Sequence, residues 1–95
     1  MAKYIHITDE EKRRAYENAN ALQYALSKGY NLIQVGNEFH LKDHDSMVFT
    51  KNGIWFWNSK GLRGSAIDFM IHYEGKSFPE AVKILAGTVP GIAAP

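Results

Sequence analysis

The 95-residue chain contains no cysteine. That absence excludes disulfide bonds, thiolate zinc sites and cysteine nucleophiles. No apolar run approaches membrane-spanning length, and the first residues, MAKYIHITDEEKRR, lack the apolar core of a secretion signal. The sequence therefore predicts a cytoplasmic protein without a membrane segment.

An excess of charge of one sign is also missing. Eleven Lys and Arg residues face ten Asp and Glu residues, which leaves a formal net charge of +1. Any nucleic-acid binding would therefore have to use a local basic patch. The motifs G-x-S-x-G, G-x-G-x-x-G and H-E-x-x-H and the phosphate-binding P-loop are absent as well. We expect a protein that is not an enzyme and that uses no cofactor.

The residues that are present indicate one α+β domain. Hydrophobic residues make up 45% of the chain, enough for a single compact core. We assign the domain to residues 1–88 and a flexible tail to residues 89–95. At its start, Thr8 and Glu11 have the spacing of a helix capping box. The helical pattern continues to Gly29, and Asn18 and Asn20 mark a break that would divide it into a helix pair.

The middle of the chain predicts a small antiparallel sheet. We expect strands at 32–35, 39–41, 47–50 and 54–57, with a polar loop at 42–46 and a glycine-rich turn after residue 57. Asn52 and Gly53 form the strongest hairpin motif of the chain. Ser65 and Ser77 then begin two C-terminal helices, so the predicted order is helix or helix pair, sheet, and two helices.

The last predicted strand carries two tryptophans ahead of a basic turn. Trp55 and Trp57 share one face of the strand, and Phe56 lies on the other. If the tryptophans face outward, they flank Lys60 and Arg63, as in single-strand-binding platforms. If they belong to the core, Phe56 is exposed instead and the patch is only basic.

One polar segment, HLKDHD, offers an alternative site. It brings together His40, Asp43, His44 and Asp45. Histidines and carboxylates can bind a metal or move a proton, so a metal-dependent enzyme is one interpretation. We favour a solvated loop between strands, because short motifs of this kind often match by chance.

The order of these segments resembles the N-terminal zinc-binding domain of bacterial replicative DNA primases over roughly residues 20–86. The stretches that carry the resemblance are GLRGSAIDF and YEGKSFPEAVKIL. The ligand positions of that family fall on Leu41, His44, Trp57 and Lys60. Only His44 keeps the ligand type, and a structural zinc needs four donors, so we expect no bound metal.

A closer resemblance is to a zinc-less form of that domain, which precedes toprim-like domains in proteins of plasmids and integrative elements. The stretch LKDHDS and the W-x-W strand carry it. It implies that apolar packing replaces the metal. We expect Leu41 and Trp57 to fill the vacated space, with Trp57 as a core plug and Trp55, if exposed, as the stacking residue.

By this resemblance the chain would be a non-catalytic nucleic-acid-binding module, for single-stranded DNA, in the replication or transfer of mobile elements. The candidate contact residues are Lys42, Lys51, Trp55, Lys60 and Arg63. The alternative is a protein-interaction domain that has lost DNA binding, with a partner in replication or conjugation. The near-neutral charge favours this alternative, and an exposed apolar patch or self-association would be its sign. We expect a monomer.

Overall fold

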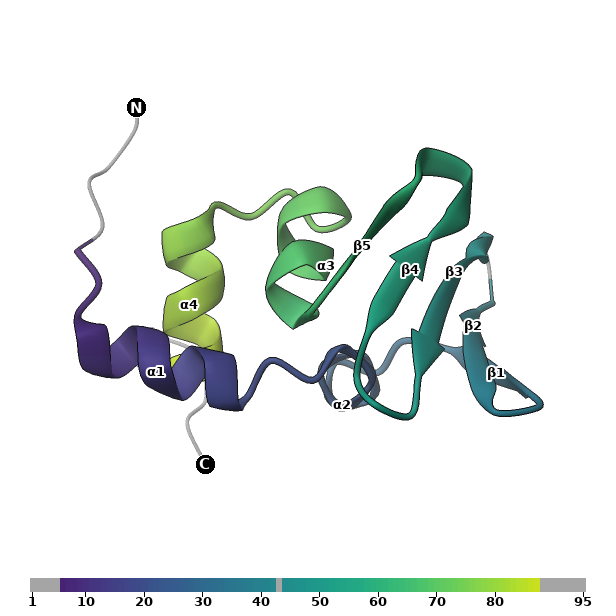
Figure 1. Ribbon diagram of the computed structural model, residues 1–95, viewed down its shortest axis with the longest axis horizontal. Helices are drawn as coiled ribbons and strands as arrows, with labels where there is room; N and C mark the ends of the chain where they lie inside the picture. Colours follow the sequence, from purple (N-terminus) through teal and green to yellow (C-terminus); the bar gives the residue numbers. More distant parts are fainter. Residues whose placement is uncertain (1–5, 43, 88–95) are drawn as a thin grey trace.

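The computed structural model describes residues 6–42 and 44–87, and it confirms the predicted α+β class (Figure 1). The predicted tail, residues 89–95, lies outside the described residues. The elements follow one another as α1 Asp9–Glu17, α2 Ala21–Ser27, β1 Leu32–Val35, β2 Glu38–Leu41, β3 His44–Thr50, β4 Trp55–Trp57, a 3₁₀ turn Asn58–Lys60, β5 Leu62–Gly64, α3 Ala66–His72 and α4 Phe78–Ala86.

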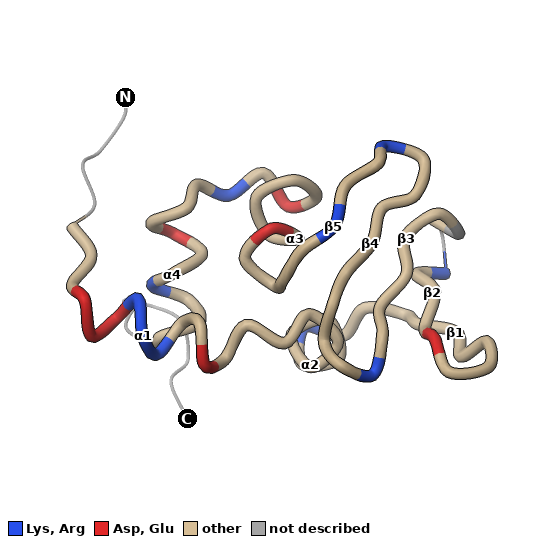
Figure 2. The backbone as a smooth tube through the Cα atoms, viewed as in Figure 1, with Lys and Arg blue, Asp and Glu red and all other residues tan. Residues whose placement is uncertain are grey.

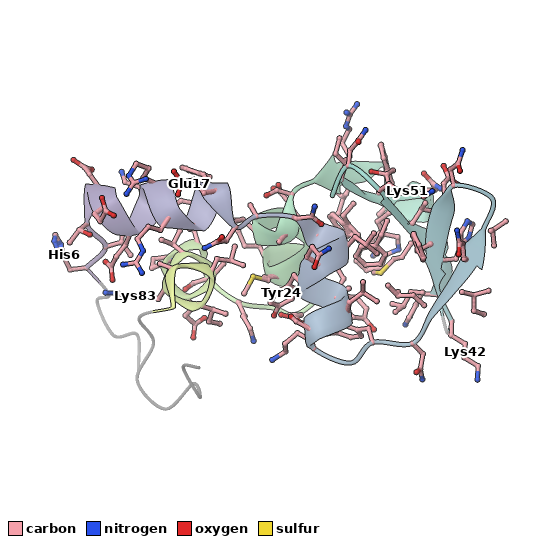
Figure 3. All side chains as sticks on the ribbon, turned by 90° about the horizontal axis from the view of Figure 1, so that it is seen from below. His6, Glu17, Tyr24, Lys42, Lys51 and Lys83 are labelled. Atoms are coloured by element: carbon pink, nitrogen blue, oxygen red, sulfur yellow. The ribbon has the colours of Figure 1, made fainter. Side chains whose placement is uncertain are left out.

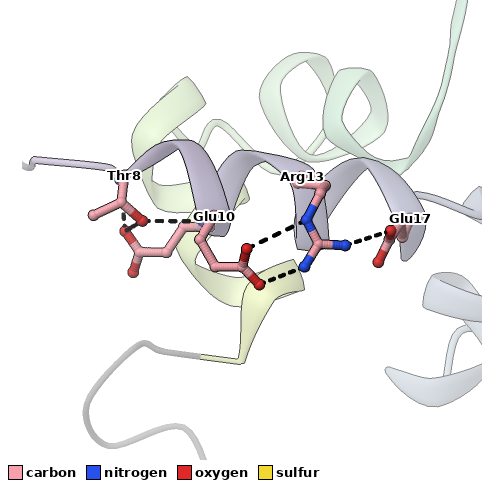
Figure 4. Close-up of polar contacts among 5 residues, drawn as sticks. Thr8, Glu10, Arg13 and Glu17 are labelled. Atoms are coloured by element: carbon pink, nitrogen blue, oxygen red, sulfur yellow. Dashed lines mark hydrogen bonds and ion pairs between the residues drawn. The ribbon is translucent and has the colours of Figure 1, made fainter.

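Local capping explains where the helices begin. At the start of α1 the Thr8 hydroxyl accepts from the Glu11 amide (3.0 Å), and the Glu11 carboxylate accepts from the Thr8 amide (2.9 Å). Arg13 then bridges Glu10 and Glu17 along the exposed side of the helix (Figure 4). The capping residues predicted at positions 65 and 77 are confirmed, and so is the break between α1 and α2.

The five strands form one antiparallel sheet in the order β1-β2-β3-β4-β5. Two details differ from the predicted strands. β3 begins at His44 and includes most of the segment predicted as a loop. Leu62–Gly64, predicted as part of a glycine-rich turn, is a fifth strand paired with β4. Pairing with a neighbouring strand stabilises both segments, although neither has the alternation of a half-buried strand.

The sheet lies at one end of the molecule, and α1 and α4 lie together at the other, with α3 between them (Figure 1). The Lys83 ammonium lies 2.9 Å from the Glu11 carboxylate and joins α4 to α1. Within the described ranges, none of the helices is long and apolar enough to cross a membrane.

The core lies between the sheet and the helices. Phe49 and Trp55 from the sheet and Phe69 and Met70 from α3 are completely buried. The Trp55 ring meets the Phe69 ring edge-on at 5.7 Å between centroids. Gly53, in the predicted Asn-Gly turn, is needed there because its φ of 86° is left-handed and a Cβ would collide with the Asn20 side chain.

Candidate nucleic-acid interface

Strand register sorts the sheet residues into two faces. Residues directly opposite each other in antiparallel strands project to the same face. One row therefore crosses all five strands on the face away from the core. This open row consists of Ile33, His40, Val48, Phe56 and Arg63, and its central residue, Val48, is buried between its neighbours at 5% exposure. The matching row on the helix side, the inner row, consists of Gln34, Phe39, Phe49, Trp55 and Gly64.

A cation covers an aromatic ring in the open row. The Arg63 guanidinium carbon lies 5.2 Å from the centre of the Phe56 ring, within the range of a cation–π interaction. Phe56 is half-buried and Arg63 is exposed. Among the side chains that the structure describes, which leave out those of Asp43 and Asp45, Arg63 forms no ion pair with a carboxylate, so its charge is available for an anion.

Two shallow hollows adjoin this pair. A hollow of about 250 Å³ is lined by Glu38, Val48, Phe56 and Asn58. A second hollow, of about 480 Å³, lies where the end of α1, the β3–β4 turn and β5 meet, and its lining includes Tyr16, Asn52 and Arg63. Tyr16 is 59% exposed there. Aromatic, amide and basic side chains therefore line these hollows together with two acidic ones, Glu17 and Glu38.

The four predicted basic residues are all exposed, but they do not form one compact patch. Lys42 follows β2 and Lys60 follows β4, so both lie at one end of the antiparallel sheet. Lys51 lies in the β3–β4 turn at the opposite end, and Figure 3 shows it well separated from Lys42. Figure 2 shows the same dispersal of Lys and Arg along the backbone. Only Arg63 lies within the open row.

Trp55 was predicted to stack on a base only if it is exposed, and the structure does not meet that condition. Its side chain is 0% exposed, with Phe69 edge-on and the His72 ring stacked on it at 6.2 Å between centroids. Trp57 is the less buried of the two, because it lies nearer the sheet end and contacts Tyr73 and Lys60. Trp55 therefore cannot stack on a base in the folded protein.

Leu41, His44, Trp57 and Lys60, the positions expected from the primase resemblance to replace zinc ligands, lie in one region of the structure. His44 and Trp57 both contact the Tyr73 ring, at 5.5 and 5.9 Å between centroids. The Lys60 ammonium lies 5.1 Å from the centre of the Trp57 ring. Leu41 is buried and is the register partner of His44. Ring contacts join His44, Trp57 and Tyr73, and a hollow of about 250 Å³ lined by Leu41, His44 and Tyr73 adjoins them.

The HLKDHD segment does not bring its histidines together. His40 lies in the open row, with its Nε2 atom 3.6 Å from the Glu38 carboxylate, whereas His44 packs on Tyr73 at the helix side. Asp43 lies outside the described residues. Among the residues the structure describes, no group of three or more His, Asp or Glu side chains is placed to hold a metal ion.

One polar cluster was not anticipated from the sequence. The buried Glu74 carboxylate, just after α3, accepts hydrogen bonds of 2.6 Å from the hydroxyls of both Tyr24 and Tyr30. Burial, together with these bonds to Glu74, raises the pKa of both tyrosines above the usual value. The partners lie 50 and 44 residues apart in the chain, so no local pattern indicates the contact. The cluster anchors the end of α3 to α2.

These observations describe a small α+β domain with an antiparallel sheet that is covered by helices on one face and open on the other. No known protein family matches the chain, and no solved structure matches it. It is similar to an uncharacterized, plasmid-encoded Bacillus anthracis protein, pXO2-78, with 38% identity over 48 residues. The match covers 50% of this chain and 14% of that protein, whose name assigns no activity.

Proposed function

We propose that the chain is a non-catalytic nucleic-acid-binding module for single-stranded DNA, and that it binds through the open row of the sheet. The observation that carries the proposal is the exposed Arg63 guanidinium on the Phe56 ring, on a face that the helices leave uncovered. An aromatic ring beside a cation can stack a base and contact its phosphate at once.

The dimensions of the open row suit a short single strand. Neighbouring strands lie about 4.8 Å apart, so a row across five strands extends over about 19 Å. A segment of a few nucleotides fits this length. Tyr16, beside the second hollow, offers a further exposed ring in continuation of Arg63.

The charge of the chain indicates modest affinity. The net charge is +1, and Glu38 lies next to Val48 and Phe56 on the same face. Few phosphates would be neutralised, so binding should be strongest at low salt and show a shallow salt dependence. Phosphate contacts carry no base identity, so sequence preference should be slight.

The biological setting is part of the same proposal. The similarity to a plasmid-encoded Bacillus anthracis protein is consistent with a plasmid setting, and the resemblance to primase zinc-binding domains suggests the role, in the replication or transfer of mobile elements. In that setting the domain would hold a single strand for another protein that carries the chemistry.

The test is a fluorescence-anisotropy titration of a labelled oligothymidylate at two salt concentrations. Arg63→Gln removes the cation, and we expect weaker binding with a salt slope smaller by about 0.7 for the lost phosphate contact. Phe56→Leu keeps an apolar side chain but removes the ring, and it should weaken the binding free energy of the oligonucleotide by about 1–3 kcal/mol. Lys28→Gln, at the exposed end of α2, is the matched control and should bind like the unchanged protein.

Two results would contradict the proposal. One is an absence of binding by the unchanged protein at low salt. The other is a loss of binding in the Lys28→Gln control as large as in Arg63→Gln. The first would favour the second candidate, a protein-interaction domain, for which the exposed Leu26, Ile33 and Val35 side chains are the supporting observation. The second would mean that binding does not use the open row in particular.

A further inference from the structure

Among the strands that the structure describes, the first is an unpaired edge of the sheet. β1 pairs with β2 on one side, and β1 is the last strand in the sheet order (Figure 1). The backbone amides and carbonyls that point away from β2 are therefore available to another strand. Such edges pair readily with other chains unless charges, prolines, bulges or covering segments block them.

The opposite edge of the sheet is protected, and β1 is not. β5 carries the charged Arg63 and leads directly into α3, which packs beside it. By contrast, residues 29–37, which include β1, contain no charged residue and no proline. The only register shift among the described strand pairs lies between β2 and β3, so the β1–β2 pairing is regular.

Exposed apolar side chains gather at the same edge. Of the five exposed large hydrophobic residues in the described ranges, three are Leu26 (51% exposed), Ile33 (48%) and Val35 (53%). Leu26 and Ile33 also line one hollow of about 570 Å³ beside the strand. Burial of these side chains would favour association.

We propose that β1 pairs antiparallel with β1 of a second copy about a two-fold axis, which joins two five-stranded sheets into one of ten strands. A second copy fits this edge because a two-fold axis brings the exposed Ile33 of each copy opposite the exposed Val35 of the other. Residues 29–37 carry no charge, so the pairing brings no like charges together and buries apolar side chains of both copies. This inference goes beyond the proposed function, does not depend on it, and replaces the expected monomer.

Strand geometry selects the register. Residues directly opposite each other in antiparallel strands project to the same face of the sheet. A two-fold axis that keeps the open faces of both copies on one side must therefore pass between a residue and the same residue of the second copy. If the axis passes through Gln34, Ile33 lies opposite Val35 of the second copy. The two-fold symmetry then also places Val35 opposite Ile33 of the second copy. Centring on Ile33 instead places Val35 opposite Asn31 of the second copy. The pairing around Gln34 buries more exposed apolar surface.

The affinity of this dimer should be moderate. A pairing through one short strand buries less than a standard protein–protein interface, so we expect dissociation constants in the micromolar to millimolar range. Sedimentation equilibrium over a broad concentration range is therefore the first test. The apparent mass of the unchanged protein should rise toward twice that of the monomer.

The discriminating variant is Ile33→Lys with Val35→Lys, which places cations on both sides of the two-fold axis. Both positions are exposed, so the circular-dichroism melting midpoint should stay unchanged while the dimer is lost at all concentrations. Tyr16→Lys, at an exposed aromatic position on α1, is the control and should dimerise normally. A monomer at all concentrations for the unchanged protein, or a dimer that survives the double change, would overturn the proposal.

A second test reads the register directly. The chain has no cysteine, so Gln34→Cys introduces a single thiol that would face its counterpart across the axis. Oxidation should yield a covalent dimer much faster than in Lys51→Cys, whose thiol lies in the β3–β4 turn. Equal rates in the two variants would rule out pairing around Gln34, even if either variant were destabilised.

Discussion

The open row and the inner row of the sheet differ by a single residue step along each strand. On β4, Trp55 of the inner row is completely buried against α3, whereas Phe56 of the open row is half-buried beneath Arg63. Side chains alternate between faces, so neighbouring aromatic residues enter different surroundings. The comparison teaches that the position of α3, and not the size of the aromatic ring, decides which residue is structural and which is available for contact.

The largest expected difference between the rows is in stability. Trp55→Ala should lower the free energy of unfolding by about 3–5 kcal/mol, because it empties a space enclosed by Phe69 and His72. Phe56→Ala should cost about 1–2 kcal/mol, because part of that ring already contacts water. Urea unfolding of both variants measures the difference. Equal losses would mean that the rows do not differ as described.

A smaller effect on the free energy of unfolding is expected at alkaline pH, and it comes from tyrosines on the helix side of the sheet. The pKa values of Tyr24 and Tyr30 are raised by burial and by their bonds to Glu74, so the folded state keeps their protons longer than the unfolded state does. Their contribution to stability is complete below about pH 10, the ordinary tyrosine value, and is lost as the pH rises above it. The slope is about 1.4 kcal/mol per pH unit for each such tyrosine.

Tyr24→Phe isolates this effect. Between pH 10 and pH 12 the free energy of unfolding of the variant should fall less steeply than that of the unchanged protein, by about the slope of one tyrosine. Tyr16→Phe, at an exposed tyrosine on α1, is the matched control and should leave the slope unchanged. A steeper fall in Tyr24→Phe would contradict the raised pKa.

The smallest effect on stability is expected when metal ions are removed with a chelator. The buried Leu41 side chain and the contacts of His44 and Trp57 with the Tyr73 ring hold this part of the domain together through apolar and ring contacts. Excess chelator should therefore leave the melting midpoint unchanged. A lower midpoint that zinc restores would show that the inner side of the sheet depends on a metal.

Local patterns predicted a large part of this fold. Capping residues such as Thr8 and Ser77 act within a few positions of the chain, so the helix starts were correctly placed. Strand alternation correctly placed Trp55 and Trp57 on one face. The fifth strand was missed, because a three-residue segment ending in Gly64 acquires strand structure only by pairing with β4.

The site was predicted less well, for a related reason. The relative burial of Trp55 and Trp57 depends on where α3 crosses the sheet, which no spacing in the sequence specifies. Arg63 was proposed from its charge and its place in the basic turn after the tryptophan strand, whereas its contact with Phe56 follows from cross-strand register. The Tyr24–Glu74 contact joins distant segments and has no local pattern at all.

The most direct measurement is a side-chain ¹H–¹⁵N NMR titration with a short oligothymidylate at low salt. The Arg63 Nε–H and the Trp55 indole Nε1–H report on the two faces of the sheet separately. If single strands bind across the open row, the Arg63 signal shifts with added oligonucleotide and the Trp55 signal stays in place. A shift of the Trp55 signal with the Arg63 signal unmoved would contradict binding at the open row.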